Sequence, residues 1–273
     1  MSRSPIISGV GHTAVGKLEG STAMGLHAEA ARAALGDAGI EPKDVDAVLC
    51  AYSLAAPHLM LSSVFCEYFG IRPAYSAAIQ AGGASACIMV MQAAALVKAG
   101  YARHVLVVCG DNRLSGMSRD GAVAALAEVG HPQFERPYGI SVPAAYALVA
   151  QRYMHEFGVT PEQLAEVAVV HRRHAQRHPD AQMRKPITVA DVMASKPIAT
   201  PLRLLDCCLI SDGGAAVIVS APEARSDVRK RPIEILGAGQ KNTHEHILAA
   251  PSLVDFGCRD AASQALGRAG VSL

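Results

Sequence analysis

One stretch, residues 75–110, limits what this chain can fold into more than any other, because two strands, a tight turn and a helix follow one another there. Residues 75–81 are small and suit a short strand. Gly82-Gly83 then provides the backbone freedom that a sharp turn from strand to helix requires. Residues 84–99 are apolar on nearly every face, which predicts a central helix packed on all sides, between two sheets.

The turn and the strand after this helix indicate where a functional site lies. His104–Cys109 is a continuous apolar run followed by Gly110, a pattern typical of a strand buried on both faces of a parallel sheet. The turn places backbone N–H groups at the helix start, where they are suited to hold a thiolate, a phosphate or an oxyanion. Gly82 and Gly83 are therefore candidate substrate-pocket residues.

The flanking sequence predicts alternating strands and helices, the order expected of an α/β protein. Ser21 or Thr22 is a suitable N-cap for one helix, and Gly39 a suitable end to it. Residues 111–138, rich in Gly, Ser, Met and Arg, are predicted to be loop-like. We expect strands over residues 6–10, 45–51 and 213–220, and helices over residues 23–38, 62–69, 143–157 and from Pro161 to about His178.

Composition excludes several classes of function. The 25 basic and 24 acidic residues give a net charge of +1, which does not favour nucleic acid or a membrane surface as a partner. The seven Cys have no CxxC spacing and fit the reduced thiols of a cytoplasmic protein. No apolar run reaches the roughly 18 residues of a membrane span, and the N-terminus leads directly into a strand, so we expect no signal peptide.

The chain contains an internal repeat. Residues 233–239 resemble residues 6–11, and residues 260–270 match residues 29–39 at one constant offset. The second copy stops after its first strand and helix, so we expect an incomplete polypeptide. The predicted organisation is a first half over residues 1–221 with a loop insertion at about 111–205, a linker over 222–232, and the start of a second half over 233–273.

These features together resemble the thiolase superfamily, whose fold is two similar βαβαβαββ halves packed in layers. The sequence is most similar to the lipid-transfer-protein-like branch, called SCP-x-type. The resemblance covers the chain from Ile6 to Leu273 and implies an α/β, thiolase-like layered fold with a truncated second half. The stretches that carry it are residues 77–100, Gly110-Asp-Asn, Leu209–Val217 (LISDGGAAV), Pro137–Pro143 (PYGISVP) and Arg203–Cys208 (RLLDCC).

The resemblance implies an unusual active site. Thiolases carry a nucleophilic Cys at the helix start after the third strand, and aligning the turn puts Gly83 there, so no acyl-enzyme can form at that position. The other family residues, a His or Asn, a second His and a second Cys, would lie beyond Leu273. Gly130-His131-Pro132 imitates one family motif, but it lies in the first half and lacks the Gly-x-Ser-Gly that should follow, so we interpret it as a coincidence.

Two residues near the turn are alternative nucleophiles. Cys87 lies one turn into the apolar helix, where a buried thiol usually behaves as an inert hydrophobe. Ser85 lies in a Gly-x-Ser-x-Cys sequence that half-matches the Gly-x-Ser-x-Gly nucleophile elbow of serine hydrolases, but the final Gly is missing. A serine hydrolase that uses Ser85 therefore stays open as a further alternative.

Other polar residues have two readings each. His171, His174 and His178 share a helix face with three Arg, which favours a solvated basic face or contact with coenzyme A phosphates over a metal site. Tyr138 and Asp212 lie beside Gly-containing loops, where they could line a pocket or stabilise a turn.

The resemblance implies acyl-CoA chemistry in lipid metabolism, with a coenzyme A thioester as substrate and no covalently bound cofactor. With Gly83 in place of Cys, an acyltransferase or C–C lyase of the retro-aldol type is expected to act without covalent catalysis. Family members pair their first halves across the strand before the Gly-Gly turn, so a homodimer is expected, with a small acyl-CoA-binding subunit as a further partner. The alternative is a non-catalytic thiolase homologue that serves as a scaffold or binding subunit of a heteromer.

Overall fold

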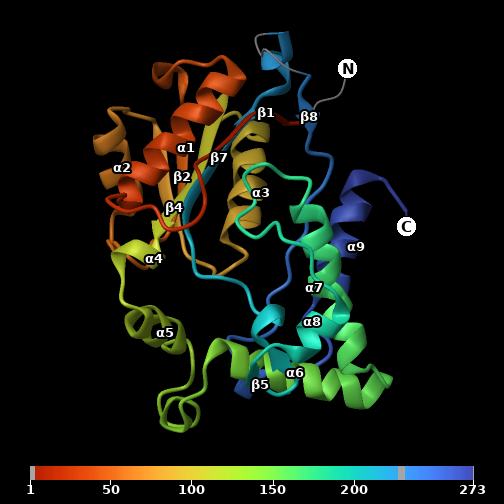
Figure 1. The fold of residues 1–273 in the computed structure, drawn as a ribbon. Helices are drawn as coiled ribbons and strands as arrows, with labels where there is room; N and C mark the ends of the chain where they lie inside the picture. The colour runs from red at the N-terminus through yellow and green to blue at the C-terminus, as the bar shows by residue number, and fades with distance from the viewer. Residues whose placement is uncertain (1–3, 227–230, 273) are drawn as a thin grey trace. The chain divides into compact units, whose positions relative to one another are not determined.

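The computed structural model describes residues 4–226 and 231–272 (Figure 1). Residues 227–230 of the expected linker lie outside the described residues. The helices are α1 (Ala23–Ala38), α2 (Leu61–Phe69), α3 (Ser85–Lys98), α4 (Arg113–Gly116), α5 (Arg119–Ala127), α6 (Val142–Phe157), α7 (Pro161–Ala175), α8 (Val189–Ala194) and α9 (Cys258–Ala269). The strands are β1 (Ile6–His12), β2 (Ala47–Ala51), β3 (Tyr75–Ile79), β4 (His104–Asn112), β5 (Pro197–Ala199), β6 (Leu202–Arg203), β7 (Asp212–Ser220) and β8 (Ile233–Glu234).

A six-stranded mixed sheet, ordered β3-β2-β4-β7-β1-β8, forms the centre of the fold. β2 pairs in parallel with both β3 and β4, whereas β7 is antiparallel to β4 and β1. β1, β2, β3 and β4 therefore run in one direction, and their carboxyl ends share one edge of the sheet. The α/β fold class predicted from the sequence is confirmed.

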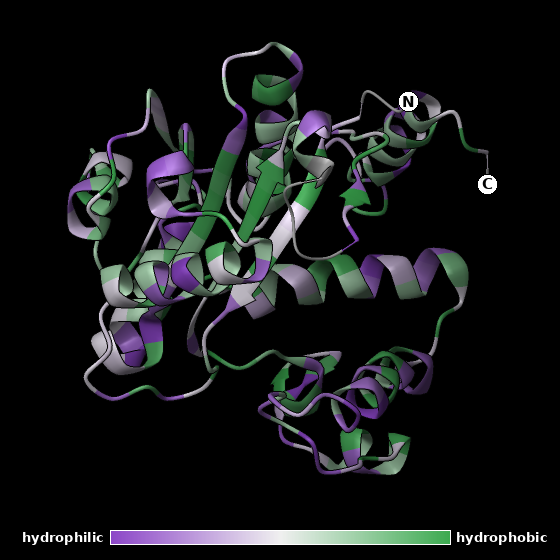
Figure 2. Cartoon of the chain, turned by 90° about the horizontal axis from the view of Figure 1, so that it is seen from above, coloured by the Kyte–Doolittle hydropathy of each residue, from purple (hydrophilic) through white to green (hydrophobic). Residues whose placement is uncertain are grey.

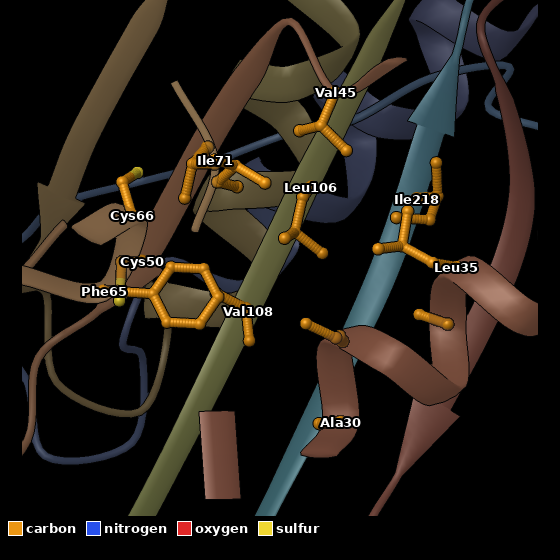
Figure 3. Packing of buried hydrophobic residues seen from close by; sticks show 14 of the residues in the cluster. Ala30, Leu35, Val45, Cys50, Phe65, Cys66, Ile71, Leu106, Val108 and Ile218 are labelled. Atoms are coloured by element: carbon orange, nitrogen blue, oxygen red, sulfur yellow. The ribbon is translucent and has the colours of Figure 1, made fainter. Parts of the chain in front are cut away.

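The sheet is buried on both faces, since alternate residues of each strand point to opposite sides. Val48 and Cys50 of β2 lie in the cluster under α1 and α2. Figure 3 shows Cys50 in this cluster with Phe65 and Ile218. The other face of the sheet packs under α3. Burial of a side chain such as Phe65 contributes about 1.5–3 kcal/mol to the free energy of folding, so the apolar residues on both faces stabilise the sheet. The central strands are drawn largely as hydrophobic in Figure 2.

Helix α1 shows how local sequence sets an element. The Thr22 hydroxyl accepts a hydrogen bond from the Gly25 N–H at 3.0 Å, and Gly39 ends the helix in the left-handed region, with φ of 75°. The bounds predicted from the sequence are confirmed. Gly9 and Gly11 of β1 lie directly against the α1 backbone, where a Cβ on Gly9 would come within 2.6 Å of the Ala38 Cβ. This close approach explains why glycine stands at positions 9 and 11.

A similar contact between glycines and a helix recurs near the C-terminus, in the segment that follows β8. A Cβ on Gly237 or Gly239 would collide with the backbone of Ala265 or Ala261 in α9. The spacing of these glycines and alanines matches that of Gly9, Gly11 and the α1 alanines.

Helix α3 differs from its prediction. Only one side of it is buried, through Ser85, Met89, Ala93, Ala94 and Val97. Ala86, Cys87 and Ala95 are exposed among the described residues. The prediction of a helix packed on all sides is therefore wrong here, because the six-stranded sheet covers one face of α3 and residues on the opposite face are exposed.

The stretch predicted to be loop-like, residues 111–138, also contains helix. α5 begins after Ser118, whose hydroxyl accepts a hydrogen bond from the Gly121 N–H at 3.0 Å. The abundance of Gly, Ser and Arg led to the prediction of a loop here. A serine N-cap and alanines at 122, 124, 125 and 127 are nevertheless sufficient to form a helix.

The chain divides into two compact units. One contains residues 1–117, 211–240 and 259–273, and includes the six-stranded sheet; the other contains residues 118–210 and 241–258. In the second unit, helices begin at N-caps Ser141, Thr160 and Thr188, and the last two form capping boxes. No helix in the described part of the chain is long and apolar enough to cross a membrane.

Candidate functional site

The carboxyl edge of the six-stranded sheet gathers the loops that follow β1, β2, β3 and β4, together with the start of β7. In open α/β sheets this edge is where ligands usually bind, because the strands end there and the loops diverge. The Gly82-Gly83 turn follows β3 at this edge, and Asp212 opposes Asn112 there.

The Gly82-Gly83 turn is held by the side chain of Ser85. The Ser85 hydroxyl donates to the Gly82 carbonyl at 2.8 Å and accepts from the Ala81 N–H at 2.9 Å. Gly82 has a left-handed φ of 57°, whereas a Cβ built on Gly83 would meet no atom within 4 Å. The turn therefore presents an open, side-chain-free position at the start of a 14-residue helix, where the helix dipole favours a developing negative charge.

The two alternative nucleophiles have different environments. Ser85 is only 4% exposed, and both hydrogen bonds of its hydroxyl close the turn. The residue therefore has a structural role rather than that of a hydrolase nucleophile. Cys87, which the sequence predicts to be buried, is exposed because α3 is covered on one face only.

Asp111 organises the loop after β2. Its carboxylate accepts hydrogen bonds from the Ser53 hydroxyl at 2.8 Å and from the Leu54 and Ala55 N–H groups. Arg113 Nε donates to the same carboxylate at 2.9 Å. Asp111, near the end of β4, thus fixes the loop after β2 to the end of its own strand.

Asp212 is fully buried and stabilises the neighbouring loop. Its carboxylate accepts hydrogen bonds from the N–H groups of Leu18, Leu114 and Ser115, at 2.9, 2.7 and 3.1 Å. Burial alone would raise the pKa of this carboxyl, but the hydrogen bonds outweigh burial and hold the pKa below its ordinary value. All these donors are backbone groups of the same unit, so Asp212 acts on loop geometry.

His27 is a buried imidazole beside this edge. Its Nδ1 lies 2.7 Å from the Ala23 carbonyl oxygen, so Nδ1 carries the proton. Nε2 has no hydrogen-bond partner among the described residues. Burial lowers the pKa of His27, which keeps the ring neutral near pH 7.

The second unit contains an apolar pocket of about 250 Å³. Tyr138, one of the predicted pocket residues, lines this pocket, and the residue is 84% exposed. The lining residues are Phe134, Glu135, Tyr138, Ile140, Ile247, Leu248 and Leu253.

Glu135 is the only ionisable carboxylate among these lining residues, and it is 6% exposed. One carboxylate oxygen accepts from the His131 N–H at 2.6 Å, and the other lies 2.6 Å from His246 Nδ1 and 3.2 Å from the Leu248 nitrogen. Burial alone would raise the pKa of Glu135, but the hydrogen bonds from His131, His246 and Leu248 lower it below its ordinary value. Glu135 therefore holds an imidazole from a segment 111 residues away.

The structure thus brings together some of the predicted residues and not others. Gly82, Gly83 and Asp212 lie at the same sheet edge, while Tyr138 belongs to the other unit. Sequence reasoning missed Glu135 and His246, since no local motif links the two positions.

The predicted helix to about His178 ends earlier. His171 and His174 lie on α7, whereas His178 follows the end of that helix at Ala175. All three histidines are exposed, as a solvated basic face would be. No group of three or more His, Cys, Asp or Glu within residues 4–226 and 231–272 is arranged to hold a metal ion.

Comparison with known proteins identifies the class. Residues 5–223 match the family model described as the thiolase N-terminal domain, so the chain belongs to the thiolase family. The resemblance inferred from the sequence is confirmed.

Two curated relatives are 36% identical to this chain, and each alignment covers 88% of it. One is the steroid side-chain-cleaving aldolase of Thermomonospora curvata, aligned over 249 residues. The other is the 17-hydroxy-3-oxo-4-pregnene-20-carboxyl-CoA lyase of Mycobacterium tuberculosis, aligned over 247 residues. The chain spans 62% and 63% of these relatives' own lengths.

A solved structure, the Ltp2-ChsH2(DUF35) aldolase, has the same fold. It matches with a TM-score of 0.85 and 32% identity, over 98% of this chain and 70% of the other. The similarity thus extends over nearly all the described residues.

Proposed function

We propose that this chain takes part in carbon–carbon bond chemistry on an acyl-CoA by a retro-aldol route, without a covalent Cys intermediate. The observation that carries the proposal is the open Gly83 position at the start of α3, in a member of a family that usually places its nucleophile there. The relatives support it, since two are named as aldolases and one as a CoA lyase.

The geometry of the turn suits this reaction. In a retro-aldol cleavage the bond between the α and β carbons breaks, and its electron pair moves onto the thioester as an enolate. Backbone N–H groups at the start of α3 stabilise such a developing oxyanion without moving. A side-chain-free Gly83 leaves room for the substrate where a thiol would stand.

The organisation and partners follow from the same resemblance. We propose a first thiolase half over residues 1–221, a linker over 222–232 and the start of a second half at 233–273, supported by the recurring glycine–helix contact at Gly237 and Gly239. We propose a cytoplasmic homodimer joined through β3, an edge strand of the sheet, that acts in lipid metabolism. A small acyl-CoA-binding subunit is a further partner, supported by the Ltp2-ChsH2(DUF35) relative.

A second candidate function is that of a non-catalytic scaffold, which the absence of a thiol at Gly83 also favours.

One experiment distinguishes the two candidates. The purified chain should be incubated, alone and with a candidate partner subunit, with 3-hydroxydecanoyl-CoA and separately with acetoacetyl-CoA plus coenzyme A. We expect 3-hydroxydecanoyl-CoA to be cleaved to octanal and acetyl-CoA. We expect no thiolysis of acetoacetyl-CoA. Iodoacetamide should label the exposed Cys87 without changing the rate. Thiolysis that iodoacetamide abolishes would refute the proposal, and no turnover of either substrate would favour the scaffold.

A further inference from the structure

Helix α7 presents an exposed stripe on which the charges are separated by sign (Figure 1). Residues spaced by three or four positions lie on one side of a helix. The exposed residues with this spacing are Glu162, Glu166, Val170, Arg173 and Arg177. Arg177 continues the stripe beyond Ala175, because the C-cap Gln176 keeps helical backbone angles, with φ of −58° and ψ of −28°. The stripe therefore has an acidic half, an apolar centre and a basic half.

Each charged half of this stripe repels itself within one chain. Glu162 and Glu166 are four positions apart, and so are Arg173 and Arg177. Like charges at this spacing destabilise a helix. Within residues 4–226 and 231–272, no ion pair or side-chain hydrogen bond joins any of these four side chains to another residue. The chain itself therefore leaves the charges of the stripe uncompensated.

The helix dipole accounts for only part of this pattern. Acidic residues are stabilising in the first turn of a helix and basic residues in the last turn, but the effect falls off beyond those turns. Glu166 lies beyond the first turn of α7. Val167 and Val170, between the charged halves, are 57% and 38% exposed, which the dipole does not explain. Apolar residues surrounded by charged ones are typical of the centre of a protein–protein contact.

A second copy of α7, placed antiparallel to the first, matches every charge of the stripe. A twofold axis just before Val170 sets Glu166 of one copy opposite Arg173 of the other. The same axis sets Glu162 opposite Arg177, because both pairs are centred on the same point of the sequence. Each copy contributes both halves, so every acidic residue of the stripe faces a basic one. An isologous contact requires this kind of self-complementarity.

We propose that the α7 stripe is a self-association surface, and that the same stripe of a second copy of this chain occupies it in antiparallel orientation. This contact is separate from the proposed pairing through β3, and it does not depend on the proposed function.

The size of the contact sets its expected strength. A helix of 15 residues is about 22 Å long. One such helix from each copy gives a small contact beside the roughly 1,200–2,000 Å² that stable interfaces bury. We therefore expect a weak association that forms at high protein concentration and dissociates in dilute solution.

Reversal of the charges on one half of the stripe tests the proposal. Arg173→Glu with Arg177→Glu makes the whole stripe acidic, and Glu162→Arg with Glu166→Arg makes it basic. Each variant alone should associate through α7 about tenfold or more weakly than the wild type, because every facing pair then repels. An equimolar mixture of the two variants should associate at least as tightly as the wild type, because opposite charges face each other again.

A matched control lies in the loop after the helix. Arg184 and Lys185 are exposed and lie outside the stripe. Arg184→Glu with Lys185→Glu changes the net charge as much as reversal of Arg173 and Arg177 does. This control should associate as the wild type does, which separates the effect of the stripe from that of overall charge.

Sedimentation equilibrium from micromolar to millimolar protein measures the association of each sample. Pairing through β3 is the same in all of them, so a difference between each variant alone and the mixture reports α7. High salt should weaken the association of the mixture, because exposed charges are screened. If a reversal variant misfolds, Arg173→Gln with Arg177→Gln removes the charge without reversing it and should also weaken association.

Two results would overturn the proposal. One is a mixture of the acidic and basic variants that associates no more than either variant alone. The other is wild-type protein that associates no more than the reversal and glutamine variants do.

Discussion

Two adjacent glycines at the start of α3 have opposite backbone requirements. Gly82 has a φ of 57°, which L residues adopt only with strain, whereas Gly83 has no such restriction and open space around it. Gly82→Ala should therefore lower the free energy of unfolding by about 1–2 kcal/mol. Gly83→Ala should leave it unchanged or raise it by about 0.4–1 kcal/mol. Urea unfolding of both variants measures the difference, and equal losses would show that the turn constrains both positions.

Asp212 makes stability depend on pH. Its folded-state pKa lies below the unfolded value of about 3.9, so its stabilisation is fully present above that value and is lost as the pH falls through the folded pKa. Asp212→Asn, which places an amide donor among backbone donors, should cost about 1–3 kcal/mol at pH 7.

The control for this prediction is the exposed Asp44. The loss caused by Asp212→Asn should shrink as the pH falls below about 4, because the carboxyl of the unfolded wild-type chain is protonated there before the folded one is. Asp44→Asn should have little effect throughout. A loss for Asp212→Asn that stays constant between pH 7 and pH 3 would contradict the assignment.

Single residues with local signals could be predicted from the sequence, and pairs formed across the fold could not. Thr22 and Gly39 are recognisable as helix ends because capping depends on neighbours within a few positions. Glu135 and His246 belong to segments that only tertiary folding brings together, and no local motif in either segment indicates that the two residues pair.

Among the helices and strands, prediction succeeded where the hydrophobic pattern is strong. β4 and α1 follow from apolar runs and caps, whereas α5 is short and surrounded by residues typical of loops. The burial of α3 was overestimated, because an apolar sequence indicates what a helix can bury and not what covers it in this chain.

The contact between β1 and α1 depends on glycine at the strand. A Cβ on Gly11 would lie 2.6 Å from the Ala30 carbonyl oxygen and 2.7 Å from the Ala33 Cβ, and backbone cannot yield as a side chain does. Gly11→Ala should cost about 1–3 kcal/mol through overpacking.

Gly36 supplies the opposite case within α1 itself. It is exposed and a Cβ there would meet nothing within 4 Å, so Gly36→Ala should stabilise the protein by about 0.5–1 kcal/mol. Chemical denaturation of the two variants compares them directly. A Gly11→Ala protein as stable as the wild type would mean that β1 and α1 can move apart freely.

The outer edge of β3 is where the proposed dimer interface can be tested. The Tyr75 N–H donates to the Asp46 carbonyl oxygen, and the Ile79 carbonyl accepts from the Tyr52 N–H. Residues 75, 77 and 79 therefore form their backbone hydrogen bonds on the β2 side. Ser76 and Ala78 then direct their N–H groups to the free edge. If the proposed dimer forms there, Ser76→Pro should convert it to a monomer with an unchanged circular dichroism spectrum.

Ala77→Pro is the contrasting variant, because it removes a bond to β2 and should destabilise the fold itself. Light scattering coupled to gel filtration gives the mass of each protein. A Ser76→Pro protein that stays dimeric would exclude this edge as the interface.

The order in which the strands are translated leaves parts of the sheet unpaired in the growing chain. β7 pairs with both β1 and β4, yet about a hundred residues separate the end of β4 from the start of β7. At roughly 5–20 residues per second, translation of that interval takes about 5–20 s. During this time β1 and β4 lack the strand that pairs with their inner edges, and those edges can pair with neighbouring nascent chains. We therefore expect chaperones to shield those edges until Ser220 has left the exit tunnel.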